Sequence, residues 1–377
     1  MRKLLLASAI TIVTVPVAQA APEIYGKAFL TSDYVNGEAD YDDRGNIESP
    51  DDSDIDELQI NSNFSRIGLR GSEAITTDTD VIYRLEYGID IDGDDSGTLQ
   101  SRDTYLGLKN DNYGELRVGR NSSIFSYLYD PILNRAYWDN LGKRTLNDNG
   151  GVSALNMLDY TRSSNSALWI APEYKDLQLV LQYAADESFD NEDGEEGYGA
   201  ALKLDQGTGY TAAIAYSKDI EASGSIETLD SITDDNAEGR INYGGDAFRG
   251  AVTVDVDKYI NIATPLTLGA VYQQADYDFA GSDKEKGLIL SGKIGLNNLN
   301  RPAFIYVQYN NTENLNGIGN NDSDQIVVGG EYNFKDNIIG HAYIGQNSAD
   351  YTSPTDPTNS VADIKVFAAG AGIEYLF

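Results

Sequence analysis

The 377-residue chain has no cysteine, a single histidine and few basic residues. The absence of cysteine excludes disulfides and thiolate metal sites. Only 27 basic residues stand against 60 acidic ones, so the chain lacks the basic surface that binding of nucleic-acid phosphates requires. Long apolar runs are missing too. Beyond the first twenty residues, none approaches the ~18 residues needed for a membrane-spanning helix.

The first twenty residues have the pattern of an export signal. Arg2 and Lys3 give a positive start, residues 4–17 are mostly apolar, and residues 18–20 (A-Q-A) form a small-x-small cleavage site. The alternative is a buried N-terminal core helix. We expect residues 1–20 to be removed and residues 21–377 to form one domain. The 27 basic residues less Arg2 and Lys3 leave 25 against 60 acidic ones, a formal net charge of −35.

What the chain has in abundance is tyrosine, glycine and period-two alternation. There are 26 Tyr and 37 Gly, and stretches such as 81–87 (V-I-Y-R-L-E-Y) alternate apolar with polar residues. This pattern predicts strands with one apolar and one polar face. The mean hydropathy of −0.39 is compatible with a membrane barrel, in which half of each strand faces water. Sixteen strands are predicted, and counts of fourteen or eighteen stay open: 22–33, 57–71, 79–91, 99–109, 114–121, 164–172, 176–185, 196–205, 208–218, 247–257, 265–276, 285–296, 302–311, 323–334, 338–347 and 363–377.

The connections between these strands alternate in length. Short ones, such as 110–112 and 335–337, are followed by long ones, among them 34–56, 122–163, 219–246 and 348–362. Short turns at one end and long loops at the other are typical of outer-membrane barrels. We therefore predict an all-β fold, a sixteen-stranded antiparallel transmembrane β-barrel. The alternative is a soluble β-sandwich, which would more typically have shorter strands and a clearer turn rhythm.

The last predicted strand has two contrasting faces. One face is apolar and ends in aromatic residues, and the other carries Gly370, Gly372 and Glu374. A terminal aromatic residue on a lipid face would lie in an interfacial girdle. The apolar face consists of Phe367, Ala369, Ala371, Ile373, Tyr375 and Phe377.

Six segments carry a family resemblance. They are 24–28 (IYGKA), 65–71 (SRIGLRG), 101–109 (SRDTYLGLK), 114–120 (GELRVGR), 165–174 (NSALWIAPEY) and 374–377 (EYLF). In this order they make the mature chain resemble the general, non-specific porins of Gram-negative outer membranes. The resemblance implies a homotrimer of barrels with short periplasmic turns and long external loops, passing ions and small hydrophilic solutes by passive diffusion without a cofactor. It also implies that Tyr375 and Phe377 belong to a C-terminal signal for the barrel-assembly machinery.

The resemblance further implies a constriction. The loop 122–163 would fold into the lumen, with Asp130 and Asp139 as its acidic side. Lys27, Arg66 and Arg102 match wall positions on the basic side. Opposite charges across a narrow aqueous gap produce a transverse field that favours polar solutes over apolar ones. The alternative for each residue is a charge that only solvates the inner wall.

Two features of the sequence bear on the constriction. Tyr127, Tyr137 and Trp138 in the loop predict that it packs against other residues, because a solvated loop does not need them. Porins of this kind often carry a further basic residue near the sixth strand, where this chain has Ile170 and Ala171 and offers only Arg162 upstream. A weaker basic side, together with the charge of −35, predicts a mild preference for cations.

Acidic residues crowd two other loops, 34–56 and 186–196. The simpler interpretation is that charge keeps these loops solvated. The alternative is that divalent cations bridge the carboxylates to lipopolysaccharide phosphates, since hard cations prefer oxygen ligands. Residues 90–95 (D-I-D-G-D-D) begin like a calcium loop, but Asp95 replaces the glycine and Ser101 the final glutamate, so we predict no metal site there.

Other functions are less well supported. His341 could serve as the general base of a barrel hydrolase, but no nucleophile motif such as G-x-S-x-G accompanies it, and we predict no enzyme activity. Two alternatives to a general channel stay open: a substrate-selective channel, and a plugged barrel acting as an adhesin or anchor.

Overall fold

The computed structural model describes residues 21–41, 53–93, 99–128, 131–138, 154–157, 162–185, 196–220, 222–223, 242–243, 245–278, 282–352 and 361–377. Within these ranges the helical segments are three short 3-10 turns, η1 (Ile124–Tyr127), η2 (Val256–Lys258) and η3 (Leu315–Gly317). No helix found in these ranges is long and apolar enough to cross a membrane. The predicted export signal, residues 1–20, lies outside the described residues.

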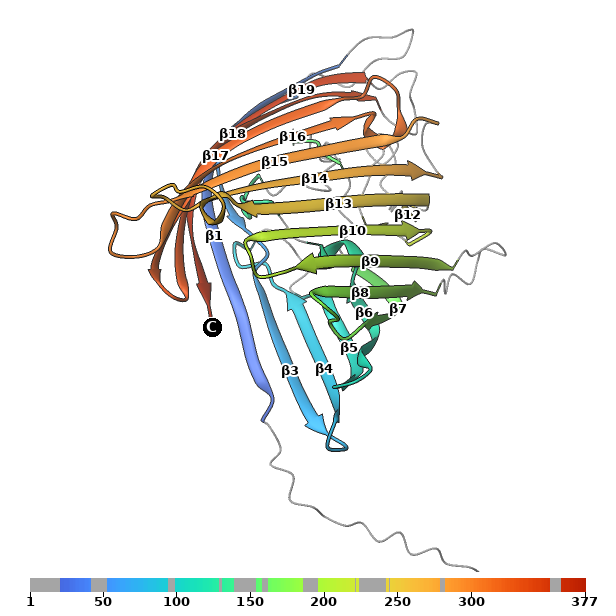
Figure 1. Cartoon of the computed structure of the whole chain (residues 1–377). Helices are drawn as coiled ribbons and strands as arrows, with labels where there is room; N and C mark the ends of the chain where they lie inside the picture. The colour runs from blue at the N-terminus through green and yellow to red at the C-terminus, as the bar shows by residue number, and fades with distance from the viewer. Residues whose placement is uncertain are drawn as a thin grey trace, which may run out of the picture.

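One large sheet contains nearly all of the strands (Figure 1). A separate small pair joins β11 (Ala222–Ser223) to β12 (Asn242–Tyr243). The strands of the large sheet are β1 (Glu23–Tyr41), β2 (Ser53–Ser62), β3 (Arg66–Ala74), β4 (Thr79–Gly88), β5 (Gln100–Asn110), β6 (Gly114–Ser122), β7 (Arg162–Ile170), β8 (Leu177–Ala184), β9 (Gly197–Asp205), β10 (Tyr210–Lys218), β13 (Gly245–Asp255), β14 (Leu266–Tyr277), β15 (Glu285–Gly295), β16 (Ala303–Glu313), β17 (Ser323–Lys335), β18 (Ile338–Thr352) and β19 (Val361–Leu376).

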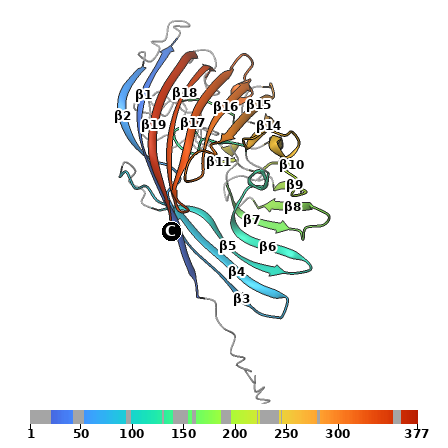
Figure 2. The same cartoon turned by 60° about the vertical axis from the view of Figure 1, so that its left-hand side comes forward.

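The sheet closes on itself. β1 pairs with β19 on one side and with both β2 and β3 on the other, so β2 and β3 are two halves of one strand interrupted at residues 63–65. Counted in this way, sixteen strands each pair antiparallel with both neighbours. Figure 2 shows β19 lying between β1 and β18 where the ring closes. The predicted sixteen-stranded antiparallel barrel is confirmed.

The two faces of each strand differ as the alternation predicts. In β19, Val366 and Ala368 are buried on the inside, whereas Ile373, Tyr375 and Phe377 are 57%, 44% and 49% exposed on the outside. Exposed apolar side chains of this kind continue around the outer surface, as expected for a surface that contacts lipid.

Several strands are longer than predicted at the end remote from the chain termini. β1 continues to Tyr41 and β18 to Thr352, where the predicted ends were residues 33 and 347. The outward residues of the extension of β1 include the polar Asn36 and Glu38, so the apolar alternation fades although the ladder with β19 continues. The predicted loop 34–56 is correspondingly shorter, and Asp40, Asp54 and Asp56 lie in strands.

Short turns join the strands at the end where β1 begins and β19 finishes. Residues 75–78, 111–113 and 336–337 form three of them. The short turns of outer-membrane barrels face the periplasm, so we take this end as periplasmic.

Candidate functional site

The connection between β6 and β7 folds into the barrel. Its backbone donates hydrogen bonds to inward-facing amides of the wall: the N–H of Ile124 to Gln182 Oε1 (3.0 Å) and the N–H of Leu133 to Gln308 Oε1 (2.8 Å). Farther along, the N–H of Leu155 donates to Asn347 Oδ1 (3.1 Å). The loop is therefore bound to the inner wall from β8 to β18.

Trp138 is the largest buried anchor of this loop. It is fully buried, and its indole N–H donates to the carbonyl of Ala368 on β19 (3.2 Å). The ring lies over Gly345 of β18, where an added Cβ would come within 2.6 Å of it. A glycine is thus required at this place in the wall, and Tyr137 packs edge-on against the indole at 5.1 Å.

The prediction that the aromatic residues of the loop pack against the protein is confirmed. The hydroxyl of Tyr127 accepts a hydrogen bond from Arg117 Nη1 (2.9 Å), and burial raises the pKa of Tyr127 to about 12. The predicted acidic residues of the loop, Asp130 and Asp139, lie outside the described residues, and Arg135 is the charged residue that its described part presents.

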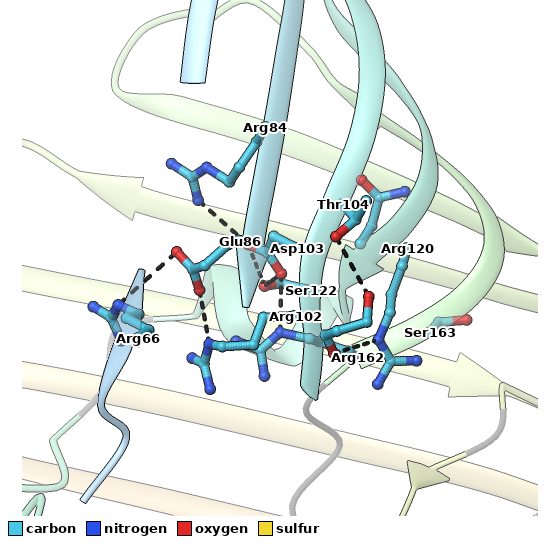
Figure 3. A network of polar contacts seen from close by, with 12 residues as sticks. Arg66, Arg84, Glu86, Arg102, Asp103, Thr104, Arg120, Ser122, Arg162 and Ser163 are labelled. Atoms are coloured by element: carbon cyan, nitrogen blue, oxygen red, sulfur yellow. Dashed lines mark hydrogen bonds and ion pairs between the residues drawn. The ribbon is translucent and has the colours of Figure 1, made fainter. Parts of the chain in front are cut away.

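Opposite the loop, the inner wall of β3–β7 carries charged side chains that meet at two carboxylates (Figure 3). The first is Glu86 on β4. It accepts a hydrogen bond from Arg102 Nε (2.7 Å) and one from the hydroxyl of Tyr25 (2.9 Å). Arg66 Nε lies 3.9 Å from its second oxygen. Glu86 therefore holds two of the predicted wall residues, Arg66 and Arg102, at one point.

The second carboxylate is Asp103 on β5. Arg162 Nε on β7 donates to it at 3.0 Å, and Arg84 Nη1 on β4 at 3.3 Å. The hydroxyl of Ser122 adds a further hydrogen bond of 2.9 Å. Arg162 thus places a basic group of β7 against Asp103, and the expectation of a weaker basic side stays a prediction.

Arg120 on β6 completes this group, which we call the arginine cluster: Arg66, Arg84, Arg102, Arg120 and Arg162. The guanidinium of Arg120 donates to the carbonyl of Ser101 (3.1 Å) and to the hydroxyl of Ser164 (2.6 Å). Four of the five guanidinium groups contact the two carboxylates, and in the described part of the chain that of Arg120 bonds only neutral groups, so this part of the wall carries excess positive charge.

Backbone irregularities make the arginine cluster possible. The register of β4 against β5 shifts between Leu85 and Tyr87, so Glu86 alone faces two consecutive residues, Arg102 and Asp103. Such a bulge lets neighbouring side chains, which would normally point to opposite faces, both point inward. A second shift separates β6 from β7 after Gly119, next to Arg120.

Lys27 lies at the edge of this wall and has local partners. It pairs across the ladder with Arg66, is only 7% exposed, and its Nζ lies 3.5 Å from Glu374 Oε2. His341 is close by, with Nδ1 3.5 Å from Glu331 and Nε2 3.8 Å from Glu374. Within the described ranges, no group of three or more histidine or acidic side chains could hold a metal ion.

The two aromatic residues of the predicted assembly signal lie on the outer surface. Phe377 exchanges backbone hydrogen bonds with Gly26 at 2.8 and 3.1 Å, and its ring lies 5.9 Å from that of Tyr375. The last residue is thereby paired to β1.

Comparisons with known proteins decide the family. The family model for Gram-negative porins matches residues 7–352, which is most of the chain. The chain belongs to the Gram-negative porins. An outer membrane porin protein of Bordetella pertussis is 27% identical over 197 residues. That match covers 49% of this chain and spans about half, 48%, of the relative.

Solved porins share the fold of this porin at low sequence identity. An anion-selective porin from Comamonas acidovorans superposes with a TM-score of 0.61 at 16% identity, covering 95% of this chain and 99% of that one. The trimer form of OmpT from Vibrio cholerae gives 0.58 at 15% identity, covering 94% and 99%. This porin belongs to the cell outer membrane, and its family and fold point to a channel rather than to an enzyme.

The sequence predicted only some of the residues of this site. Lys27, Arg66 and Arg102 were predicted and lie together on the inner wall. Arg84, Arg120, Glu86 and Asp103 were missed. Arg84 and Glu86 alternate with Leu85 inside a predicted strand, which would have placed both in the lumen; the inward turn of Asp103 depends on the bulge, which has no periodic signal.

Proposed function

We propose that this porin is a water-filled channel through which ions and small hydrophilic solutes diffuse passively. The arginine cluster with Glu86 and Asp103, opposite a loop held inside a closed barrel, carries this proposal. Such a charged wall keeps water ordered and makes the passage of apolar solutes unfavourable. The same observation argues against a plugged barrel that serves only as an adhesin or anchor, because a plugged lumen does not require a hydrated charged wall.

Two observations bear on ion selectivity. The excess of acidic residues supports the mild cation preference that the sequence predicts, because a negative surface potential concentrates cations near the channel mouths. The arginine cluster favours a second candidate, a preference for anions at the narrowest part of the wall.

The first prediction tests both the channel and its selectivity. Purified porin in planar bilayers is expected to give stable steps of KCl current, and liposomes that contain it should swell faster with a monosaccharide than with a trisaccharide. The reversal potential measured in a KCl gradient is expected to have the sign that indicates higher permeability for K⁺ than for Cl⁻. An absence of current would contradict the channel, and a reversal potential of opposite sign would replace cation by anion preference.

We further propose three partners. The trimer form of the similar Vibrio cholerae protein supports a homotrimer. The acidic outer ends of β1 and β2 support lipopolysaccharide binding through divalent cations. The paired, outward-facing Phe377 supports a role for Tyr375 and Phe377 in recognition by the barrel-assembly machinery.

One membrane preparation tests these partners. Unheated porin is expected to migrate on a denaturing gel as an oligomer of three chains, with lipopolysaccharide that a chelator releases. Deletion of Phe377 should lower the amount of folded porin in outer membranes, since β1 loses a partner at the seam. A monomer, lipopolysaccharide retained in the chelator, or an unchanged amount of the deletion variant would each contradict one of the three proposals.

A further inference from the structure

A polar pocket of about 710 Å³ lies on the inner wall between the arginine cluster and the periplasmic turns. The periplasmic halves of β3–β6 form most of it. Arg84 of the arginine cluster lines its upper edge, and Asp80, Lys109 and Asp111 line its lower part. We call it the periplasmic pocket. A solute leaving the arginine cluster toward the periplasm passes along it.

The upper layer of the periplasmic pocket contains an incompletely compensated positive charge. Arg70 and Arg84 face each other across the β3–β4 ladder, but Arg70 forms two hydrogen bonds with Glu23, at 2.7 and 2.8 Å. Arg84 shares its partner Asp103 with Arg162. The Nε atom of Arg84 is buried without a hydrogen-bond partner in the described part of the chain. The side chain of Arg84 as a whole is 28% exposed, so an incoming anionic group can reach the outer N–H donors of its guanidinium.

Aromatic rings fix the guanidinium groups of this region in place. Arg70 lies over the ring of Tyr25 at 4.9 Å, and Arg84 lies 5.7 Å from the same ring. Arg117 lies over Tyr105 at 4.7 Å and pairs with Glu115 at 2.5 Å. Cation–π contacts hold such side chains in a defined orientation, so Arg84 keeps its place in the lining of the pocket.

The lower layer carries the opposite excess. Lys109 lies between Asp80 and Glu115 in the ladder, and Glu115 is already paired with Arg117. Asp80 receives one hydrogen bond, from the hydroxyl of Ser72 (2.6 Å). The adjoining turns contribute two more carboxylates to the lining, Asp78 and Asp111. Three aspartates therefore stand against one lysine.

The distance between the two layers selects the solute. Arg84 and Asp80 are four residues apart on β4, which in a strand corresponds to about 13 Å between their Cα atoms. We propose that the periplasmic pocket binds zwitterionic solutes whose charges are separated by several ångströms, such as short peptides. The carboxylate lies toward Arg84 and the ammonium group toward Asp80 and Asp111. This inference rests on the proposed channel function.

Singly charged solutes of the same size fit less well. An anion gains from Arg84 but is repelled by the aspartates, and a cation has the reverse arrangement. An extended tripeptide spans roughly 10 Å, and the side chains of Arg84 and Asp80 are long enough to cover the remaining few ångströms. Triglycine, N-acetyl-triglycine and triglycinamide therefore form a matched set of probes that differ in end charges.

The experiment measures how each probe, added on the periplasmic side, reduces the KCl current through single channels. Triglycine is expected to act at about two- to fivefold lower concentration than either singly charged analogue, the range for one solvent-exposed ion pair. In the double variant Asp80→Asn/Asp111→Asn, triglycine should act no better than N-acetyl-triglycine. The control variant is Asp205→Asn, which alters an aspartate at the periplasmic end of β9 and should keep the native order of the three probes.

The outcomes separate this inference from the proposed function. Channels that conduct KCl but respond equally to the three probes would overturn the zwitterion site and leave the channel intact. Retention of the triglycine advantage in the double variant, or its loss in Asp205→Asn, would overturn the site as well. Absence of KCl current in the native protein would instead contradict the channel itself.

Discussion

Replacing Trp138 by alanine is expected to widen the channel and make its current noisy. Trp138 is fully buried and fixes the loop to β19 through its indole N–H. Truncating a buried tryptophan typically removes about 3–5 kcal/mol of packing, and here that loss falls on the loop, since the β17–β19 ladders stay paired. The single-channel conductance should rise and spread over several levels, and trisaccharides should enter liposomes faster relative to monosaccharides.

The chain contains a matched control for this variant, because it has two tryptophans. Trp169 on β7 donates its indole N–H to the carbonyl of Tyr113 (2.8 Å) at the periplasmic end, away from the loop. Trp169→Ala should leave the conductance and the sugar ratio at native values. Gly345→Leu, which fills the space under the indole, should act like Trp138→Ala. A folded Trp138→Ala barrel with native conductance would contradict the anchoring role of Trp138.

The barrel was predictable from sequence because nearly every strand alternates apolar residues that face lipid with residues that face the lumen. Even the short β8 is therefore visible as Leu177, Leu179 and Leu181 on one face with Gln178 and Gln182 on the other. The predicted strand ends are wrong where this alternation stops. Beyond Tyr34 the outward residues of β1 are polar, yet the ladder with β19 continues to Tyr41.

The site was less predictable because it depends on irregular backbone. A period-two pattern places Arg102 and Asp103 on opposite faces, whereas the bulge opposite Glu86 turns both inward. Such a shift costs little and leaves no periodic trace. The resemblance to porins identified Arg66 and Arg102 by position. It could not reveal that two carboxylates each hold two guanidinium groups.

The change Glu86→Gln is expected to shift selectivity toward anions. Glutamine keeps the shape of the side chain but removes the charge that holds Arg102 at 2.7 Å and lies near Arg66. One unit charge about 6 Å from an ion in water contributes roughly 0.7 kcal/mol. Its loss favours an anion and disfavours a cation by that amount, so the anion-to-cation permeability ratio should rise up to about tenfold. The measurement is the reversal potential in a KCl gradient, at low ionic strength where screening is weakest.

Glu38→Gln is the matched control for this change. Glu38 lies on the outer face of β1, and its partner is Lys365, 3.4 Å away, so the same loss of charge occurs outside the lumen. Its reversal potential should stay native. Removing Glu86 also frees two guanidinium groups that repel each other across the wall, so current fluctuations should increase in Glu86→Gln only. A shift toward cations, or equal shifts in the two variants, would mean that the bulk charge of the chain sets its selectivity and not the arginine cluster.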